Sequence, residues 1–176
     1  MRIGIDIDDT LSKTHEEVIK TKRKFFPEYV TSLLPPDLFK IFEKNHIRDI
    51  HTSSEAKEGA SKALKWLHEH NFEIFIITAR NTDFAYNDSK KFLDNNDLFF
   101  DKLIVDSNNK AEVCQKENIS LFIDDKESVC DDLSYHGIDV IKMARIDENT
   151  SKYNTFNNWE EILEYIKENY YGQNNN

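Results

Sequence analysis

The sequence predicts an α/β fold built on a parallel sheet, because short apolar runs alternate with segments of helical pattern along most of the chain. The runs expected to be strands are residues 3–7, 72–77, 102–105, 121–123 and 138–143. Apolar residues recur at helical spacing in the segments 56–70, 83–95, 110–117, 126–135 and 159–170. With 176 residues, 39% of them hydrophobic, the chain fits one domain, or a core with a small inserted module.

Residues 12–55 interrupt this alternation. The segment contains no strand pattern, breaks at Pro27 and at Pro35-Pro36, and is far longer than an ordinary connection between a strand and a helix. Its apolar residues predict three or four short helices. We interpret them as a helical cap, inserted into a core of residues 1–11 and 56–176, that covers the strand ends. The alternative is a helical decoration packed on the sheet edge.

The first predicted strand runs directly into the carboxylates of Asp6, Asp8 and Asp9. Asp6 and Asp8 are two residues apart, so they point to the same side of an extended chain. At roughly 4 Å and an effective dielectric constant near 20, two carboxylates repel each other by about 4 kcal/mol. A bound cation or a shifted pKa offsets such a cost. The simpler alternative is an acidic, solvated turn.

Polar residues also follow the other predicted strands: Thr78, Ala79 and Arg80 after the second, Lys110 after the third, Asp124 and Asp125 after the fourth. Ligands of open α/β sheets bind at the carboxyl ends of the strands, where these residues would meet. The clustered carboxylates predict a site for a hard cation such as Mg²⁺.

Each of these residues also has a structural interpretation. Thr78 can cap the helix that follows it, and Asp124-Asp125 can form an acidic turn. Lys110 is expected at the start of a helix capped by Ser107 or Asn108, where the helix dipole disfavours a cation. A lysine in that place indicates an anionic partner or an ion pair.

The ordered set formed by Asp6-Ile7-Asp8-Asp9-Thr10, Thr78, Lys110 and Asp124-Asp125 resembles the motifs of the haloacid dehalogenase (HAD) superfamily. The resemblance implies a three-layer Rossmann-like core with a parallel sheet and, from the insertion after the first motif, a small helical cap of the C1 type. Aspartate at position 8 is typical of the phosphatase members of that superfamily.

The resemblance also implies a mechanism. Asp6 is expected to attack phosphorus and form an aspartyl-phosphate, and Asp8 to act as general acid and base, with its pKa raised by the crowded carboxylates. Lys110 would neutralise charge on Asp6 and on the phosphate. The expected phosphate-binding residues are Thr78, Ala79, Arg80 and Lys110, and the expected metal ligands are Asp6, Asp8 through its backbone carbonyl, Asp124 and Asp125. For Arg80, an outward position at a helix start is an equal alternative.

A narrower resemblance, to the 5′(3′)-deoxyribonucleotidases of the cytosolic type C group, rests on Ile76-Ile77-Thr78-Ala79-Arg80 and Phe122-Ile123-Asp124-Asp125-Lys126. It implies that a nucleoside monophosphate is the substrate and that aromatic residues of the cap contact the base. The candidates are Phe25, Phe26, Tyr29, Phe39 and Phe42. The alternatives are a phosphatase or phosphomutase acting on a sugar or cofactor phosphate, and a catalytically silent Mg²⁺-binding module.

Composition restricts the partners. The net charge of −10 without a basic stripe argues against a protein that coats nucleic acid. No apolar run approaches the ~20 residues of a membrane span. Cys114 and Cys130 form no disulfide pattern and lie in predicted helices, so we expect structural thiols and a cytoplasmic location.

Overall fold

Six parallel strands, in the order β3-β2-β1-β4-β5-β6, form the sheet of the described part of the chain. The computed structural model describes residues 1–145 and 151–171. The strands are β1 (Arg2–Ile5), β2 (Glu73–Ile77), β3 (Lys102–Ile104), β4 (Leu121–Asp124), β5 (Asp139–Met143) and β6 (Asn154–Phe156). The predicted α/β class is confirmed. The sequence analysis missed β6, because this edge strand is only three residues long and lacks an apolar run.

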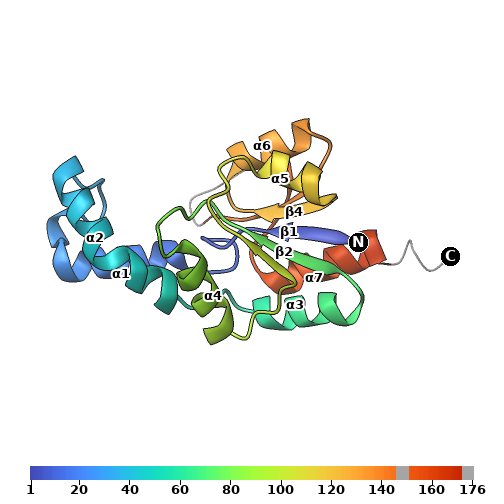
Figure 1. The fold of residues 1–176 in the computed structure, drawn as a ribbon, viewed down its shortest axis with the longest axis horizontal. Helices are drawn as coiled ribbons and strands as arrows, with labels where there is room; N and C mark the ends of the chain where they lie inside the picture. The colour runs from blue at the N-terminus through green and yellow to red at the C-terminus, as the bar shows by residue number, and fades with distance from the viewer. Residues whose placement is uncertain (146–150, 172–176) are drawn as a thin grey trace.

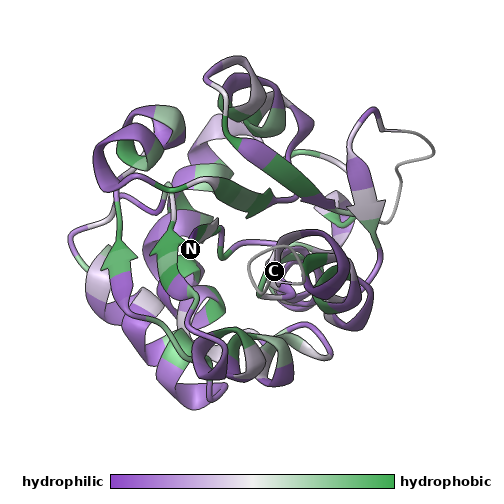
Figure 2. Ribbon diagram, turned by 90° about the vertical axis from the view of Figure 1, so that its right-hand side faces the viewer, coloured by the Kyte–Doolittle hydropathy of each residue, from purple (hydrophilic) through white to green (hydrophobic). Residues whose placement is uncertain are grey.

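The sheet lies between two layers of helices (Figure 1), and residues of its central strands belong to two different apolar clusters. On β1, Ile3 and Ile5 belong to the larger apolar cluster, which includes Leu64 and Trp159. Phe75 and Phe122 belong to the other cluster, with residues of the helices on the opposite face. Gly4 is required on β1, since a Cβ there would overlap the ring of Phe122. Figure 2 shows the apolar strands lying between more polar helices.

The core helices lie close to their predicted ranges. They are α3 (Ala60–Glu69), α4 (Ala85–Asn95), α5 (Lys110–Glu117), α6 (Glu127–Tyr135) and α7 (Trp159–Ile166), followed by a π-helical turn, η2 (Lys167–Tyr171). Strand–helix–strand connections on both faces produce the three layers expected for this fold. Cys114 in α5 and Cys130 in α6 are buried and unpaired, as expected of structural thiols.

The segment of residues 12–55 differs in detail from the prediction of three or four short helices. It forms α1 (Thr14–Phe25), the 3₁₀ turn η1 (Pro27–Tyr29) and one long helix, α2 (Pro36–Ser53). The prolines begin η1 and α2 rather than breaking a helix, because a missing N–H costs nothing at the first helical position. Figure 1 shows these helices extending away from the sheet.

The inserted segment leaves and rejoins the core at one place. Ser12 and Ala56 form an isolated antiparallel bridge, and the amide of Lys57 donates to the carbonyl of Leu11 at 2.7 Å. The C-terminal end of α2 is bound to α4: Arg48 makes two hydrogen bonds with the buried carboxylate of Asp88, at 2.9 and 3.0 Å. This end of α2 is therefore bound to the core. No helix within the described ranges is long and apolar enough to cross a membrane.

Candidate active site

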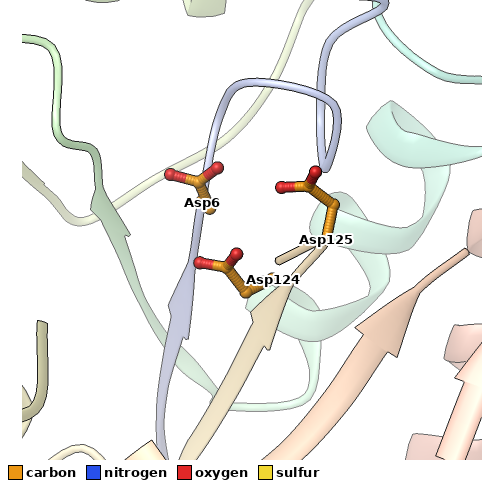
Figure 3. Close-up of side chains that lie close together, drawn as sticks. All are labelled: Asp6, Asp124 and Asp125. Carbon is orange, nitrogen blue, oxygen red and sulfur yellow. The ribbon is translucent and has the colours of Figure 1, made fainter. Parts of the chain in front are cut away.

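The ends of β1 and β4 place three carboxylates together. Asp6 follows β1 directly, and its amide still donates to the carbonyl of Ile123 at 3.0 Å, so its side chain has a position set by the sheet. Asp124 ends β4 and Asp125 follows it. One oxygen of each carboxylate lies within 4.8 Å of the others, and all three residues are buried (Figure 3).

This donor set fits a hard divalent cation. Both carboxylate oxygens of Asp125 are buried and have no hydrogen-bond partner among the described residues. Burial, followed by the charges of Asp124 and Asp9, raises the pKa of Asp125 to about 6. Among the described residues, the nearest cation to Asp125 is Arg145, whose Nε lies 3.7 Å from Oδ2, too far for a hydrogen bond. Buried carboxylate oxygens without hydrogen bonds are costly, and Mg²⁺ prefers oxygen ligands of this kind. The geometry therefore favours a cation site over a solvated acidic turn.

Lys110 binds two of the three carboxylates. Its Nζ lies 2.7 Å from Asp6 Oδ1 and 2.6 Å from Asp124 Oδ2, and the residue is 7% exposed. Burial by itself disfavours the ammonium, but the charges of Asp6 and Asp124 outweigh it and raise the pKa of Lys110. These ion pairs explain a cation in the first turn of α5. The cap of that helix is Asn109, whose side chain accepts from the Glu112 amide, rather than the expected Ser107 or Asn108.

Asp6 has a raised pKa. Burial is the largest cause, the charge of Lys110 opposes it, and Asp124 and Asp8 reinforce it, so that the pKa of Asp6 rises to about 7. In the metal-free protein this carboxyl group therefore competes for a proton near neutral pH.

The pKa of Asp8 is shifted in the direction opposite to the one expected from the sequence. Its carboxylate accepts hydrogen bonds from Arg80 Nη2 at 2.6 Å, Arg80 Nε at 3.0 Å and Thr14 Oγ1 at 2.7 Å. Burial alone would raise the pKa of Asp8, but the charge and hydrogen bonds of Arg80 prevail and lower it to about 2. The prediction of a raised pKa was wrong, because the sequence does not show that an arginine from another strand end pairs with this acid.

Arg80 has neither an outward position nor a free guanidinium. Its side chain is 2% exposed, and besides Asp8 it donates to the His51 carbonyl and to Ser89 Oγ, both at 3.3 Å. Arg80 thus links the strand end after β2, the acid Asp8 and the last turn of α2.

Thr78 and Ser107 lie beside each other at neighbouring strand ends. Thr78 does not cap α4, which begins only at Ala85; instead its Oγ1 accepts from the Arg80 amide at 3.3 Å. The Ser107 amide donates to the Thr78 carbonyl at 3.1 Å. The hydroxyl of Ser107 is buried and has no partner in the part of the chain that the structure describes. From the sequence, Ser107 was expected only as a helix cap and not as a site residue.

These side chains open into a pocket of about 630 Å³, a size suited to a small metabolite. It contains most of the residues expected from sequence: Asp6, Asp8, Thr78, Ala79, Arg80 and Lys110. Three residues of α2, namely Glu43, Ile47 and His51, form another part of the wall, and α6 and the loops supply Asn81, Thr82, Ser107, Asn108, Lys126, Ser128, Val129 and Asp132.

None of the five aromatic candidates of the inserted segment lines this pocket, as far as the described residues define it. Phe26 and Phe42 lie with His46 in an aromatic cluster that joins α1 to α2, and Phe25 stacks on His46 at 4.4 Å between ring centroids. At most one or two of these rings were expected to face the substrate, and none of them lies on the described pocket wall. A small helical segment needs its aromatic residues for its own packing.

His51 was not predicted as a site residue. It is 8% exposed, and its Nδ1 has no hydrogen-bond partner within residues 1–145 and 151–171. Burial and the charge of Arg80 lower the pKa of His51 to about 4, so the imidazole is neutral near pH 7. A sequence signal existed, since Glu43, Ile47 and His51 share one face of a helix at a spacing of four residues, but the helix boundaries were needed to see it.

The chain was compared with protein-family models, with curated proteins and with solved structures. No protein-family model matches the sequence, and a search of curated proteins finds no significant match. Solved structures do match. A haloacid dehalogenase-like hydrolase from Streptococcus pneumoniae is 15% identical, with a TM-score of 0.70 over 94% of this chain and 97% of that chain.

Two further solved structures resemble the chain with similar sequence identities and TM-scores. A structure described as a predicted phosphatase, from Clostridium acetobutylicum, is 15% identical, with a TM-score of 0.67 over 95% of this chain and 98% of that chain. A HAD family hydrolase from Deinococcus radiodurans R1, solved with bound phosphate and sodium, is 12% identical, with a TM-score of 0.66 over 95% of each chain. The parallel sheet and these likenesses together show that this protein has the HAD-like fold.

Proposed function

We propose that this protein is a Mg²⁺-dependent phosphomonoester hydrolase. One observation supports this most strongly: Asp6, Asp124 and Asp125 form a buried group with Lys110 between two of them, and Asp6 and Lys110 line a pocket at the carboxyl ends of the strands. A cation held there and an ammonium beside it would offset the charge of a phosphate approaching a carboxylate. The solved structures of similar fold include a haloacid dehalogenase-like hydrolase and one described as a predicted phosphatase.

In the proposed mechanism, Asp6, Asp124, Asp125 and the backbone carbonyl of Asp8 would hold Mg²⁺, which supplies positive charge opposite the phosphate oxygens. An oxygen of Asp6 attacks phosphorus, a new P–O bond forms to Asp6, and the bond to the leaving-group oxygen breaks. Asp8 gives its proton to that oxygen, later removes a proton from water, and the water hydrolyses the aspartyl-phosphate. Lys110, Thr78 and the amides of Ala79 and Arg80 hold the phosphate.

The observed ion pair adds one requirement to this mechanism. In the resting protein Asp8 is a carboxylate bound by Arg80, which is the form needed to deprotonate water. For Asp8 to carry a proton in the first step, Arg80 must turn from Asp8 to the incoming phosphate. This exchange is consistent with a phosphate-binding role of Arg80.

We further propose residues 12–55 as the cap that recognises the leaving group, and a nucleoside monophosphate as the first substrate class to test. The resemblance at residues 76–80 and 122–126 supports the nucleotide. The pocket wall supports a second candidate, a sugar or cofactor phosphate, because no phenylalanine, tyrosine or tryptophan of the described residues lines it.

The reaction is tested by hydrolysis of p-nitrophenyl phosphate with Mg²⁺ and with EDTA, where we expect turnover only with the metal. The substrate class is tested by kcat/KM for dUMP or dTMP against glucose 6-phosphate. A higher value for the nucleotides supports the nucleotidase, whereas an equal or lower value favours the sugar phosphatase. Absence of hydrolysis with every ester would instead favour a silent Mg²⁺-binding module.

A further inference from the structure

The side of α2 that lines the pocket changes in polarity and exposure along the helix, beside the proposed reaction centre. His51, Ile47 and Glu43 follow one another at intervals of four residues and all line the pocket. At a rise of about 1.5 Å per residue, Glu43 lies roughly 12 Å further along the helix than His51. The surface therefore passes from a buried imidazole, over an aliphatic side chain, to an exposed carboxylate.

The near end of this surface is fixed next to Asp8. Arg80 binds the carboxylate of Asp8 and also the backbone carbonyl of His51. His51 lines the pocket, and its Nδ1 is buried without a hydrogen-bond partner among the described residues. A buried polar atom without a partner is costly, and a ligand hydroxyl would remove that cost.

The far end carries negative charge. Glu43 on α2 and Asp132 on α6 both line the pocket. Of the two lysines on the wall, Lys110 is assigned to the phosphate by the proposed function, which leaves Lys126 for a further anion. A leaving group with its own carboxylate or second phosphate would meet like charge at Glu43, whereas an amine or another N–H donor would meet an acceptor.

We infer that the His51–Ile47–Glu43 face of α2 is the specificity surface of this site. It selects phosphomonoesters whose leaving group has a hydroxyl near the ester oxygen and an uncharged or cationic hydrogen-bond donor at its far end. This inference rests on the proposed function for the orientation of the ligand, with its phosphate at Lys110. A nucleoside with an amino-substituted base and an amino sugar both satisfy the description.

The test measures binding rather than turnover, so its result does not depend on whether the protein is a hydrolase. The probes are three phosphonates with six-carbon chains, which have the same head and differ at the far end: 6-aminohexylphosphonate, hexylphosphonate and 6-phosphonohexanoate. Dissociation constants are measured by calorimetry with Mg²⁺ present. We expect the amine to bind about fivefold tighter than the carboxylate, as for a solvent-exposed ion pair.

Reversing the charge of Glu43 tests whether this residue causes the preference for the amine over the carboxylate. In Glu43→Lys the preference should invert, a change of about tenfold or more in the ratio of the two dissociation constants, with hexylphosphonate unaffected. The matched control is Asp49→Lys, the same reversal on the same helix at a residue that lies outside this pocket. An unchanged ratio in Glu43→Lys, or an equal change in both variants, would overturn the inference.

The near end is tested with a second pair, 2-hydroxyethylphosphonate and ethylphosphonate. We expect the hydroxyl to tighten binding about fivefold in the wild type, to lose that advantage in His51→Leu, and to keep it in His51→Asn, whose amide offers a polar atom close to the position of Nδ1. A hydroxyl advantage that persists in His51→Leu would remove His51 from the surface. The proposed function is judged separately, by hydrolysis of p-nitrophenyl phosphate.

Discussion

The strand ends and the inserted helices line the same pocket but are built in different ways. Asp6, Asp124 and Lys110 are buried, and they stand next to strands or a helix whose backbone bonds leave them little freedom. In the inserted segment, α1 has no buried residue and α2 has three, Phe42, Ile50 and His51. On the proposed function, the reacting groups would lie on the firmly packed part of the molecule, and the leaving group would meet the less firmly packed part.

The largest expected effect on activity is that of a substitution at the strand ends. Asp6→Asn preserves the shape of the side chain but removes the proposed nucleophile, so the proposed phosphatase activity should fall by at least about 10³-fold. Activity is measured with p-nitrophenyl phosphate and Mg²⁺, and circular dichroism checks that the fold is intact. Substantial activity in this variant would exclude Asp6 as the nucleophile.

Asp124→Ala should abolish activity and also destabilise the metal-free protein. From sequence alone, removing one clustered acid would be expected to relieve repulsion and leave the protein as stable or more stable. In the structure Asp124 binds Lys110 and accepts from the Lys126 amide at 2.9 Å, so its loss leaves a buried cation with one partner. We expect the free energy of unfolding in EDTA to fall by about 3 kcal/mol. Unchanged stability would show that these bonds contribute little.

The same substitution made in both regions sharpens the comparison. Phe92 on α4 is fully buried in the main core, so Phe92→Ala should lower the free energy of unfolding of the whole protein by about 3–5 kcal/mol. Phe42 on α2 lies in the aromatic cluster of the inserted helices. Phe42→Ala should speed amide hydrogen exchange in α1 and α2 while the sheet remains protected. Equal loss of protection in both regions would contradict this division.

Metal affinity should depend on pH through the strand-end acids. The raised pKa of Asp6, about 7, means that the folded metal-free protein holds this proton more tightly than the unfolded chain. The resulting stabilisation is present at low pH and is lost as the pH rises through about 7. Mg²⁺ must displace the proton, so affinity should rise by up to about tenfold per pH unit below 7. Calorimetry in buffers of different ionisation enthalpy measures the released proton; a pH-independent affinity would count against Asp6 as a ligand.

The smallest effect is expected where the two regions are joined. Arg48→Ala removes the bonds from α2 to Asp88, so the specificity surface should lose order and KM should rise by about twofold with kcat little changed. The control is Lys90→Ala, which removes an exposed ion pair with Asp94 within α4. If both variants have the same KM, the Arg48–Asp88 contact does not order α2.

The sequence by itself determined the fold class, the strands near the centre of the sheet and the acids that follow them. The physical reason is local: a buried parallel strand must be an apolar run, and its carboxyl end must carry the polar residues. The same reasoning predicted the helices of the core within a few residues, because their apolar faces repeat at helical spacing.

Pairings between distant residues were decided only by the tertiary structure. The contacts of Arg80 with Asp8 and with the His51 carbonyl join residues far apart in the chain, and they reversed the expected pKa of Asp8. The orientation of α2 likewise turned His51 rather than a phenylalanine toward the pocket. Local pattern carries no information on such contacts, since a charge or a ring has the same sequence signal whether it meets a ligand, another side chain or water.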